Sequence, residues 1–115
     1  MRVLIFNGKF GHLKENIHKG LIVLCHFEPE DNQKTIFKVG KKVRSLAKNN
    51  LILVPFAHLS KKSASKKEAK NLFGNLVKNC EDLTRGDLVV IPFGVKKEFF
   101  LYAPADDDAI KFMNF

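Results

Sequence analysis

The sequence has no tryptophan, one tyrosine and only two cysteines, and no long apolar run. Two cysteines cannot supply a disulfide framework, so we expect a reducing, cytoplasmic environment for this chain. The longest uninterrupted apolar runs, at residues 21–25 and 51–57, are far too short to span a bilayer, and we expect no membrane partner. The apolar stretch at residues 3–6 is cut off by Asn7, Gly8 and Lys9, which argues against an export signal.

Several signatures of catalysis and ligand binding are absent as well. The histidine and cysteine pairs, Cys25 with His26 and His12 with His18, lack the spacing of a zinc site. The chain contains neither a Gly-x-Gly-x-x-Gly loop nor a Gly-Lys-Ser/Thr phosphate-binding loop, and it has no Gly-x-Ser-x-Gly turn. We therefore expect no metal and no cofactor, and any hydrolysis must depend on positioned water, a lysine and backbone N–H groups.

Positive charge is abundant and unevenly distributed. The 115 residues carry a formal net charge of +8, and residues 61–78 alone hold six lysines and one acidic residue. Such a basic segment raises the expectation of an anionic partner, although lysine-rich surfaces also arise from solubility alone. A phosphate chain could lie against these residues: Lys61, Lys62, Lys66, Lys67 and Lys70.

The most informative positive feature is a pair of similar segments. Residues 51–56 and residues 88–93 are each an apolar run that ends in Pro-Phe. Continuous apolar runs are typical of strands buried on both faces, and proline, which has no N–H, belongs where a strand stops pairing. If the two strands are neighbours, the residues that follow them, His58 and Lys97, reach one crevice outside the strand ends, where open α/β sheets place their ligands.

The element order predicts one α/β domain over residues 1–115. We expect strands at residues 1–6, 21–27, 51–56, 88–93 and 99–102, with a turn at Asn7-Gly8 and a short returning strand at 10–13. Two amphipathic helices are expected, one capped by Asp31 or Asn32 and one by Ser65 with Glu68. The tail at 106–115 is compatible with a short helix or a frayed end. The result is a mixed sheet of about five strands covered by two main helices.

Each candidate site residue also has a plain structural reading. His58 can contact a ribose or an ester, or it can simply bond a nearby backbone carbonyl. Lys97 can stabilise an oxyanion, or it can be a solvated charge in a surface hairpin beside Lys96. Gly94 allows a ligand to approach the backbone, or serves only as a turn glycine.

Residues 54–60, the segment Pro92-Phe93-Gly94-x-x-Lys97-x-Phe99 and residues 1–5 resemble the N-terminal editing domain of archaeal threonyl-tRNA synthetases. That family has the fold of D-aminoacyl-tRNA deacylases. The resemblance implies hydrolysis of the ester of mischarged Ser-tRNA(Thr) by a water molecule, assisted by the free hydroxyl of the terminal ribose. It implies a homodimer and a threonyl-tRNA synthetase catalytic subunit or domain as possible partners.

Carried over by position, the resemblance makes Lys97 the principal catalytic group, with His58 beside it. The pocket for the terminal adenosine and the seryl group would be built by Phe27, Pro55, Phe56, Ala57, Ala69, Pro92, Gly94 and Lys96. Lys96 departs from the family, which usually has an aromatic residue there. The acidic residue expected beyond the last strand falls near Ile110, and Asp107 or Asp108 could replace it only through a shifted register.

Two other functions remain compatible with the sequence. A D-aminoacyl-tRNA deacylase would share the fold, but the Ser-Gln-x-Thr and Asn-Gly-Pro motifs of that family are absent. A non-catalytic tRNA-binding module would keep the fold and the basic face, and the two departures at Lys96 and Ile110 favour it.

Overall fold

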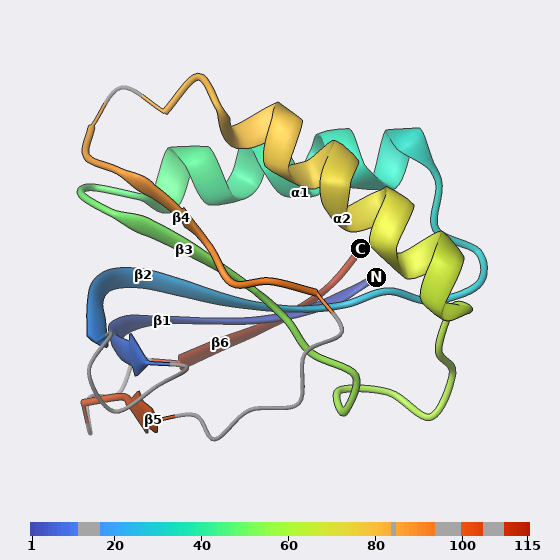
Figure 1. The fold of residues 1–115 in the computed structure, drawn as a ribbon, viewed down its shortest axis with the longest axis horizontal. Coiled ribbons are helices and arrows are strands. Elements are labelled where there is room, and N and C mark those ends of the chain that lie inside the picture. Colours follow the sequence, from blue (N-terminus) through green and yellow to red (C-terminus); the bar gives the residue numbers. More distant parts are fainter. Residues whose placement is uncertain (12–16, 84, 94–99, 105–109) are drawn as a thin grey trace.

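The computed structural model describes residues 1–11, 17–83, 85–93, 100–104 and 110–115. Figure 1 shows a single sheet with both helices on one of its faces. In chain order the elements are β1 (Arg2–Gly11), β2 (Ile17–His26), α1 (Gln33–Leu46), β3 (Leu51–Pro55), α2 (Lys66–Cys80), β4 (Leu88–Val90), β5 (Phe100–Tyr102) and β6 (Ile110–Asn114).

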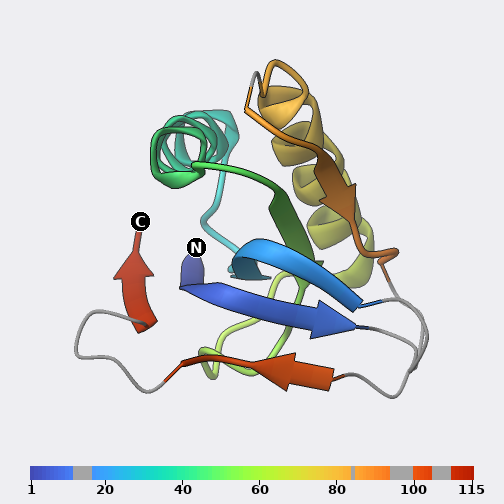
Figure 2. The same cartoon turned by 90° about the vertical axis from the view of Figure 1, so that its left-hand side faces the viewer.

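The sheet is mixed, as the sequence predicts, and has six strands where about five were expected. Its strand order is β4-β3-β2-β1-β5, and β6 pairs with β1 as well. The strands β2, β3 and β4 run parallel, while β1 is antiparallel to β2, β5 and β6. Parallel strands need a crossover, and α1 and α2 supply the two crossovers on the same face of the sheet (Figure 2).

The central strands are buried on both faces, which explains their continuous apolar runs. On the helix side a large core forms between the sheet and the apolar stripes of α1 and α2; its buried members include Val3, Ile5, Val23, Cys25, Ile36, Val39, Val43, Leu51, Leu53, Phe73 and Leu76. The opposite face carries a second, smaller core of Phe6, Phe10, Ile22, Leu24, Ile52, Val54 and Ile91. The positions alternate along each strand, as a period of two requires.

Both helices begin where their capping residues predict. Asn32 caps α1 by accepting hydrogen bonds from the backbone N–H groups of Lys34 and Thr35. Ser65 caps α2 by accepting a hydrogen bond from the N–H of Glu68. These side chains satisfy donors that have no partner within the helix. The cap at Ser65 also fixes the first turn of α2, which borders the candidate site described below.

The two helical glycines predict opposite effects of a methyl group. A Cβ at Gly40 would lie 2.9 Å from Cβ of Asn79, whereas a Cβ at Gly74 would meet nothing within 4 Å. We therefore expect Gly74→Ala to stabilise the protein by about 0.5–1 kcal/mol through helix propensity. Gly40→Ala should destabilise it, because the contact between α1 and α2 must open. Urea unfolding of the two variants checks this, and equal shifts in the same direction would contradict it.

The expected turn at Asn7-Gly8 is wrong, because β1 continues to Gly11 and pairs with β2 along its whole length. Gly8 instead permits a close approach: a Cβ there would clash with the backbone carbonyl of Tyr102 on β5. The predicted returning strand at 10–13 is wrong in its first residues, since Phe10 and Gly11 belong to β1, and the rest lies outside the described residues.

The expectation for the tail is also corrected, because Ile110–Asn114 forms β6 and not a helix. This strand pairs with the N-terminal half of β1, from Arg2 to Phe6, and the N–H of Phe115 donates to the carbonyl of Met1 at 2.8 Å. The strand expected at 88–93 ends at Val90, and β5 pairs with β1 and not with β4, so no hairpin joins them.

Candidate functional site

The two Pro-Phe segments end side by side, as their similarity predicts. Leu53 on β3 is in register with Val90 on β4, and the N–H of Ile91 donates to the carbonyl of Leu53 at 3.0 Å. Pro55 is in register with Cys25 on β2, and the next residue, Phe56, donates its N–H to the Cys25 carbonyl at 2.9 Å. The carboxyl ends of β2, β3 and β4 therefore meet at one edge of the sheet.

A pocket of about 380 Å³ opens at this edge, between the strand ends and the first turns of α2. It is lined by Phe27, Pro55, Phe56, Ala57, Ser63, Ala64, Lys66, Ala69 and Phe93. The lining is mainly apolar, and among the described lining residues Lys66 is the one charged group. A small apolar pocket with a few polar groups at the ends of parallel strands is the usual form of a ligand site.

Aromatic side chains shape the floor and rim of this pocket. The rings of Phe27 and Phe73 meet edge to face, with 6.1 Å between their centroids, and the ring of Phe73 lies 6.3 Å from that of Phe93. At the rim the imidazole of His58 stands at 81° to the ring of Phe56, with 5.2 Å between centroids. The lining rings of Phe27 and Phe93 therefore both pack against Phe73, and the lining ring of Phe56 packs against the exposed His58.

The sequence-predicted site residues fall into three groups. The pocket is lined by Phe27, Pro55, Phe56, Ala57 and Ala69 from the expected substrate site and by Lys66 from the expected phosphate-binding set. His58 and Pro92 are exposed and lie outside the lining, as do Lys61, Lys62, Lys67 and Lys70. Gly94, Lys96 and Lys97 are outside the described residues.

The site residues expected from the sequence did not include Ser63, Ala64 or Phe93. All three line the pocket. Ser63 and Ala64 precede α2 in a segment without regular structure, where no periodic pattern marks the side chains. His26, which no motif in the sequence singles out, holds this segment over the pocket.

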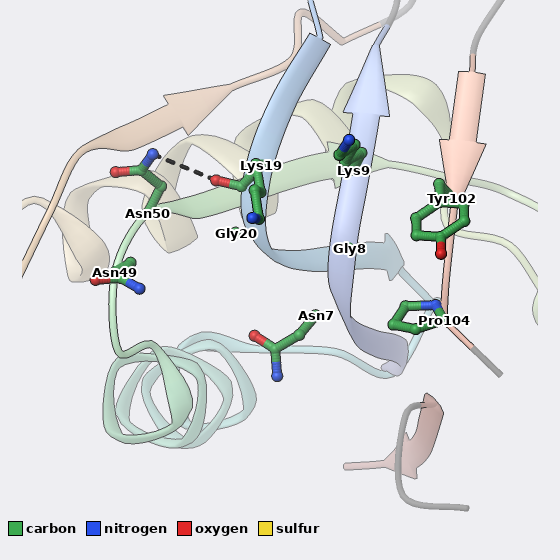
Figure 3. A pocket seen from close by; sticks show the side chains of 9 residues that line it. All are labelled: Asn7, Gly8, Lys9, Lys19, Gly20, Asn49, Asn50, Tyr102 and Pro104. Atoms are coloured by element: carbon green, nitrogen blue, oxygen red, sulfur yellow. Dashed lines mark hydrogen bonds between the residues drawn. The ribbon is translucent and has the colours of Figure 1, made fainter. Parts of the chain in front are cut away.

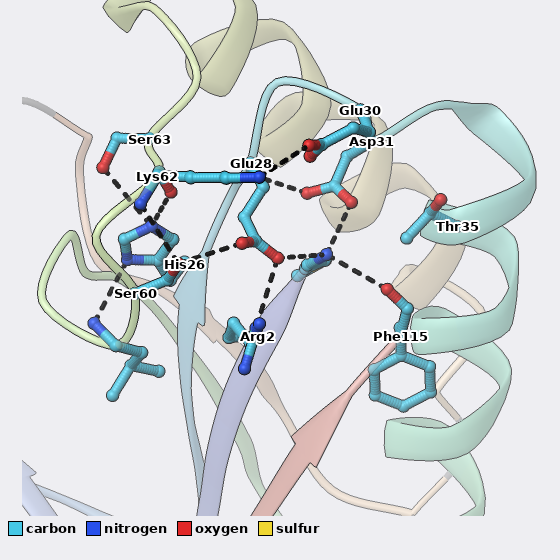
Figure 4. Close-up of polar contacts among 12 residues, drawn as sticks. Arg2, His26, Glu28, Glu30, Asp31, Thr35, Ser60, Lys62, Ser63 and Phe115 are labelled. Atoms are coloured by element: carbon cyan, nitrogen blue, oxygen red, sulfur yellow. Dashed lines mark hydrogen bonds and ion pairs between the residues drawn. The ribbon is translucent and has the colours of Figure 1, made fainter.

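His26 is completely buried at the end of β2 and fixes the segment between β3 and α2 (Figure 4). The N–H of Leu59 donates to its Nδ1 at 3.2 Å, so the ring proton is on Nε2. Nε2 lies 2.7 Å from the carbonyl oxygen of Lys62, to which it donates, and 3.3 Å from the hydroxyl of Ser63. One imidazole thus holds the middle of this segment through Leu59, Lys62 and Ser63.

A second anchor is the buried carboxylate of Glu28, which is 7% exposed. It accepts hydrogen bonds from the hydroxyl of Ser60 at 2.9 Å, from the ammonium group of Met1 at 3.2 Å and from Arg2 at 3.3 Å (Figure 4). Burial acts to raise the pKa of Glu28, but these hydrogen bonds and the ammonium charge outweigh it and lower the pKa below its ordinary value of 4.5.

The lowered pKa of Glu28 predicts a loss of stability in acid. The folded state prefers the carboxylate more than the unfolded state does, so the contribution of Glu28 is complete above the ordinary pKa of 4.5. It decreases as the pH falls through the lower folded value. We expect Glu28→Gln to lower the free energy of unfolding at pH 7 and to flatten its decline below pH 4.5. Urea unfolding across this range measures both.

The control for this prediction is Glu30→Gln. Glu30 is exposed, and its carboxylate lies 3.9 Å from the ammonium group of Lys62 with both side chains mostly in solvent. Such pairs contribute little. If Glu30→Gln flattened the acid decline as much as Glu28→Gln, the assignment to Glu28 would be wrong.

Neither cysteine is placed to act as a nucleophile. Cys25 and Cys80 are free thiols buried in the core on the helix side of the sheet. Burial raises the pKa of Cys25 and raises that of Cys80 to about 11, so both thiols are protonated at neutral pH.

Among the described residues, no three histidine, cysteine or acidic side chains are grouped to hold a metal ion. In the same part of the chain, neither helix has the length and apolar character needed to cross a membrane.

Two comparisons with known proteins find a match for this chain. The family model of the archaea-specific editing domain of threonyl-tRNA synthetase matches residues 6–107. A solved structure described as c-Myc DNA unwinding element binding protein matches with a TM-score of 0.73 and 11% sequence identity, covering 99% of this chain and 97% of the other. At that identity the likeness shows the fold alone, which is D-aminoacyl-tRNA deacylase-like. A search of the curated proteins finds no match. The family match spans most of the chain, and the chain therefore belongs to the archaea-specific threonyl-tRNA synthetase editing domains.

Proposed function

We propose that this protein removes serine from mischarged Ser-tRNA(Thr) by hydrolysing the ester that joins serine to the terminal ribose. The observation that supports this most directly is the pocket at the joint end of β2, β3 and β4, in a chain of the editing-domain family. The pocket is small and apolar, with Phe56 and the exposed His58 at a rim that can take the terminal adenosine.

The chemistry needs no protein nucleophile. The oxygen of a bound water attacks the ester carbonyl, the bond from the carbonyl carbon to the ribose oxygen breaks, and that oxygen takes a proton. In this proposal the ammonium group of Lys97 and backbone N–H groups stabilise the oxyanion, and the free ribose hydroxyl helps to orient the water. Lys61, Lys62, Lys66, Lys67 and Lys70 contact phosphates of the acceptor strand, so binding weakens as salt rises.

Discrimination against threonine rests on one methyl group. A single methylene or methyl is worth about 1–3 kcal/mol in a pocket, so simple exclusion gives modest selectivity. Ala57 and Ala69 present small side chains in the pocket lining. The proposal is that the threonyl methyl group meets this wall and displaces the water or Lys97, which slows hydrolysis more than it weakens binding.

The test compares release of the amino acid from Ser-tRNA(Thr), Thr-tRNA(Thr) and a D-aminoacyl-tRNA. We expect selective release of serine, and Lys97→Ala should slow it by about 100-fold, the usual loss when one oxyanion donor is removed. Lys41→Ala is the matched control, since Lys41 is an exposed lysine on α1, and its activity should equal that of the wild type.

Three results would contradict the proposal. Release of D-amino acids alone would make the protein a D-aminoacyl-tRNA deacylase. Binding of tRNA without release of any amino acid would make it a non-catalytic module. Equal loss of activity in Lys41→Ala and Lys97→Ala would show that total charge matters and that Lys97 has no specific role.

The homodimer and a synthetase partner belong to the same proposal, and sedimentation of the protein alone and with the synthetase tests them.

A further inference from the structure

A second hollow lies at the opposite end of β3 from the candidate site. It encloses about 700 Å³ and is lined by Asn7, Gly8, Lys9, Lys19, Gly20, Asn49, Asn50, Tyr102 and Pro104 (Figure 3). Asn49 and Asn50 directly precede β3, whereas the candidate site begins at its last residue, Pro55. Five strand residues span about 16 Å, so one small ligand cannot occupy both places.

Two glycines allow the backbone segments around this hollow to approach one another closely. Gly8 on β1 and Gly20 on β2 are directly paired. A Cβ at Gly8 would clash with the carbonyl of Tyr102, and a Cβ at Gly20 would clash with the carbonyl of Asn50. The backbones of β5 and of the turn before β3 therefore press against the β1–β2 pair, as strand glycines often permit.

The turn that forms one wall is firmly held. The carbonyl of Asn50 accepts a hydrogen bond from the N–H of Leu21 at 2.9 Å. Its side chain donates to the carbonyl of Lys19 at 3.3 Å and accepts from the N–H of Asp87 at 2.9 Å. The side chain of Asn50 is thus already hydrogen-bonded within the protein, and the shape of the hollow does not depend on a ligand.

The charge inside the hollow is unusual for a strand pair. Lys9 and Lys19 are directly opposite each other on β1 and β2, on the same face of the sheet. Like charges in this arrangement destabilise a sheet. Among the described residues neither lysine has an ion pair or a side-chain hydrogen bond, and no acidic side chain lines the hollow. Two paired lysines that have no acidic partner in the described part of the chain are typical of a binding site for an anion.

The remaining groups suit the other parts of a nucleotide. Tyr102 is half-exposed and lies on β5, which pairs with the edge of β1 away from β2. It is in register with Lys9, so its ring borders the same hollow. Aromatic rings stack on bases. Asn7 and Asn49 are exposed, and their amides can both donate and accept hydrogen bonds. The volume lies within the range of small-molecule sites.

We propose that this hollow is a second binding site, which takes a nucleoside phosphate through Lys9 and Lys19, with the base against Tyr102. The phosphate lies between the two ammonium groups and removes their mutual repulsion. The ligand is either a free nucleotide or one nucleotide of an RNA strand. The site does not depend on serine release at the other end of β3.

The test uses amide NMR spectra of the intact protein with uridine 5′-monophosphate, uridine and a uridine hexanucleotide as probes. Uridine is chosen because the candidate site is proposed to take adenosine. We expect the nucleotide to shift the amide signals of Gly8 and Gly20 and to leave Gly74 on α2 unchanged. Uridine should bind at least tenfold more weakly. Shifts with the hexanucleotide alone identify the source as an RNA strand.

Variants separate this site from general charge effects. The double substitution Lys9→Gln with Lys19→Gln should weaken binding at least tenfold, whereas Lys66→Gln, in the other pocket, should not alter it. Lys19→Glu should abolish binding and leave the thermal midpoint equal or higher, because it replaces a repulsive pair by an attractive one. The proposal is overturned if neither phosphate-bearing probe shifts Gly8 and Gly20, if uridine binds as tightly as its phosphate, or if the double variant binds normally.

Discussion

Ala69→Phe is expected to slow serine release by at least 1,000-fold, equivalent to about 4 kcal/mol of lost transition-state stabilisation. Ala69 is 8% exposed on the first turns of α2, where it lines the pocket together with Phe27 and Phe93. A benzyl group at this position takes up part of the pocket that Ala69 lines. The ester then cannot reach the geometry in which water attacks its carbonyl, and small displacements from that geometry already cost large factors in rate.

The fold should survive this change, because Ala69 lies where the core on the helix side borders an open pocket that has room for the added ring. Asn71→Phe is the matched control: it adds the same ring to an exposed position of the same helix and should leave the rate unchanged. Single-turnover release of serine, with thermal unfolding alongside, measures both properties. Normal activity of Ala69→Phe would show that the reaction takes place elsewhere.

The second large effect is expected from His26→Ala, which should lower the free energy of unfolding by about 2–4 kcal/mol. The substitution leaves a cavity and removes hydrogen-bond partners from the N–H of Leu59 and the carbonyl of Lys62. It also releases the segment between β3 and α2, which supplies Ser63 and Ala64 to the pocket. Serine release should therefore fall even at temperatures where the variant remains folded.

The comparison with His58→Ala makes this prediction specific. His58 is exposed at the rim and contacts the ring of Phe56, so its removal should change stability by less than about 0.5 kcal/mol. Urea unfolding of both variants separates an anchoring histidine from a rim histidine. Equal stability losses in the two variants would mean that the hydrogen bonds of His26 do not hold the segment.

Local signals in the sequence were sufficient for the elements that carry the candidate site. The apolar runs at 21–25 and 51–54, the caps at Asn32 and Ser65, and proline as the end of strand pairing each depend on a few neighbouring residues. The right-handed crossover rule then places β2, β3 and β4 in parallel. These rules therefore lead to the edge of the sheet at which the pocket opens, without any long-range information.

The parts that were wrong depend on partners distant in the chain. Residues 110–114 follow an acidic run that is typical of a helix start, but the free edge of β1 makes them a strand. The Asn7-Gly8 pair is typical of a turn, but pairing with β2 over ten residues prevails. His26 was overlooked as an anchor because its three partners lie more than 30 residues later in the chain.

The two buried thiols can report how often the helix layer separates from the sheet. Cys25 on β2 and Cys80 at the end of α2 have no exposed surface, and burial keeps both protonated. An alkylating reagent can therefore modify them only in molecules whose helix layer has separated from the sheet. The rate of modification then reports how often that separation occurs under native conditions, without a dye or an engineered label.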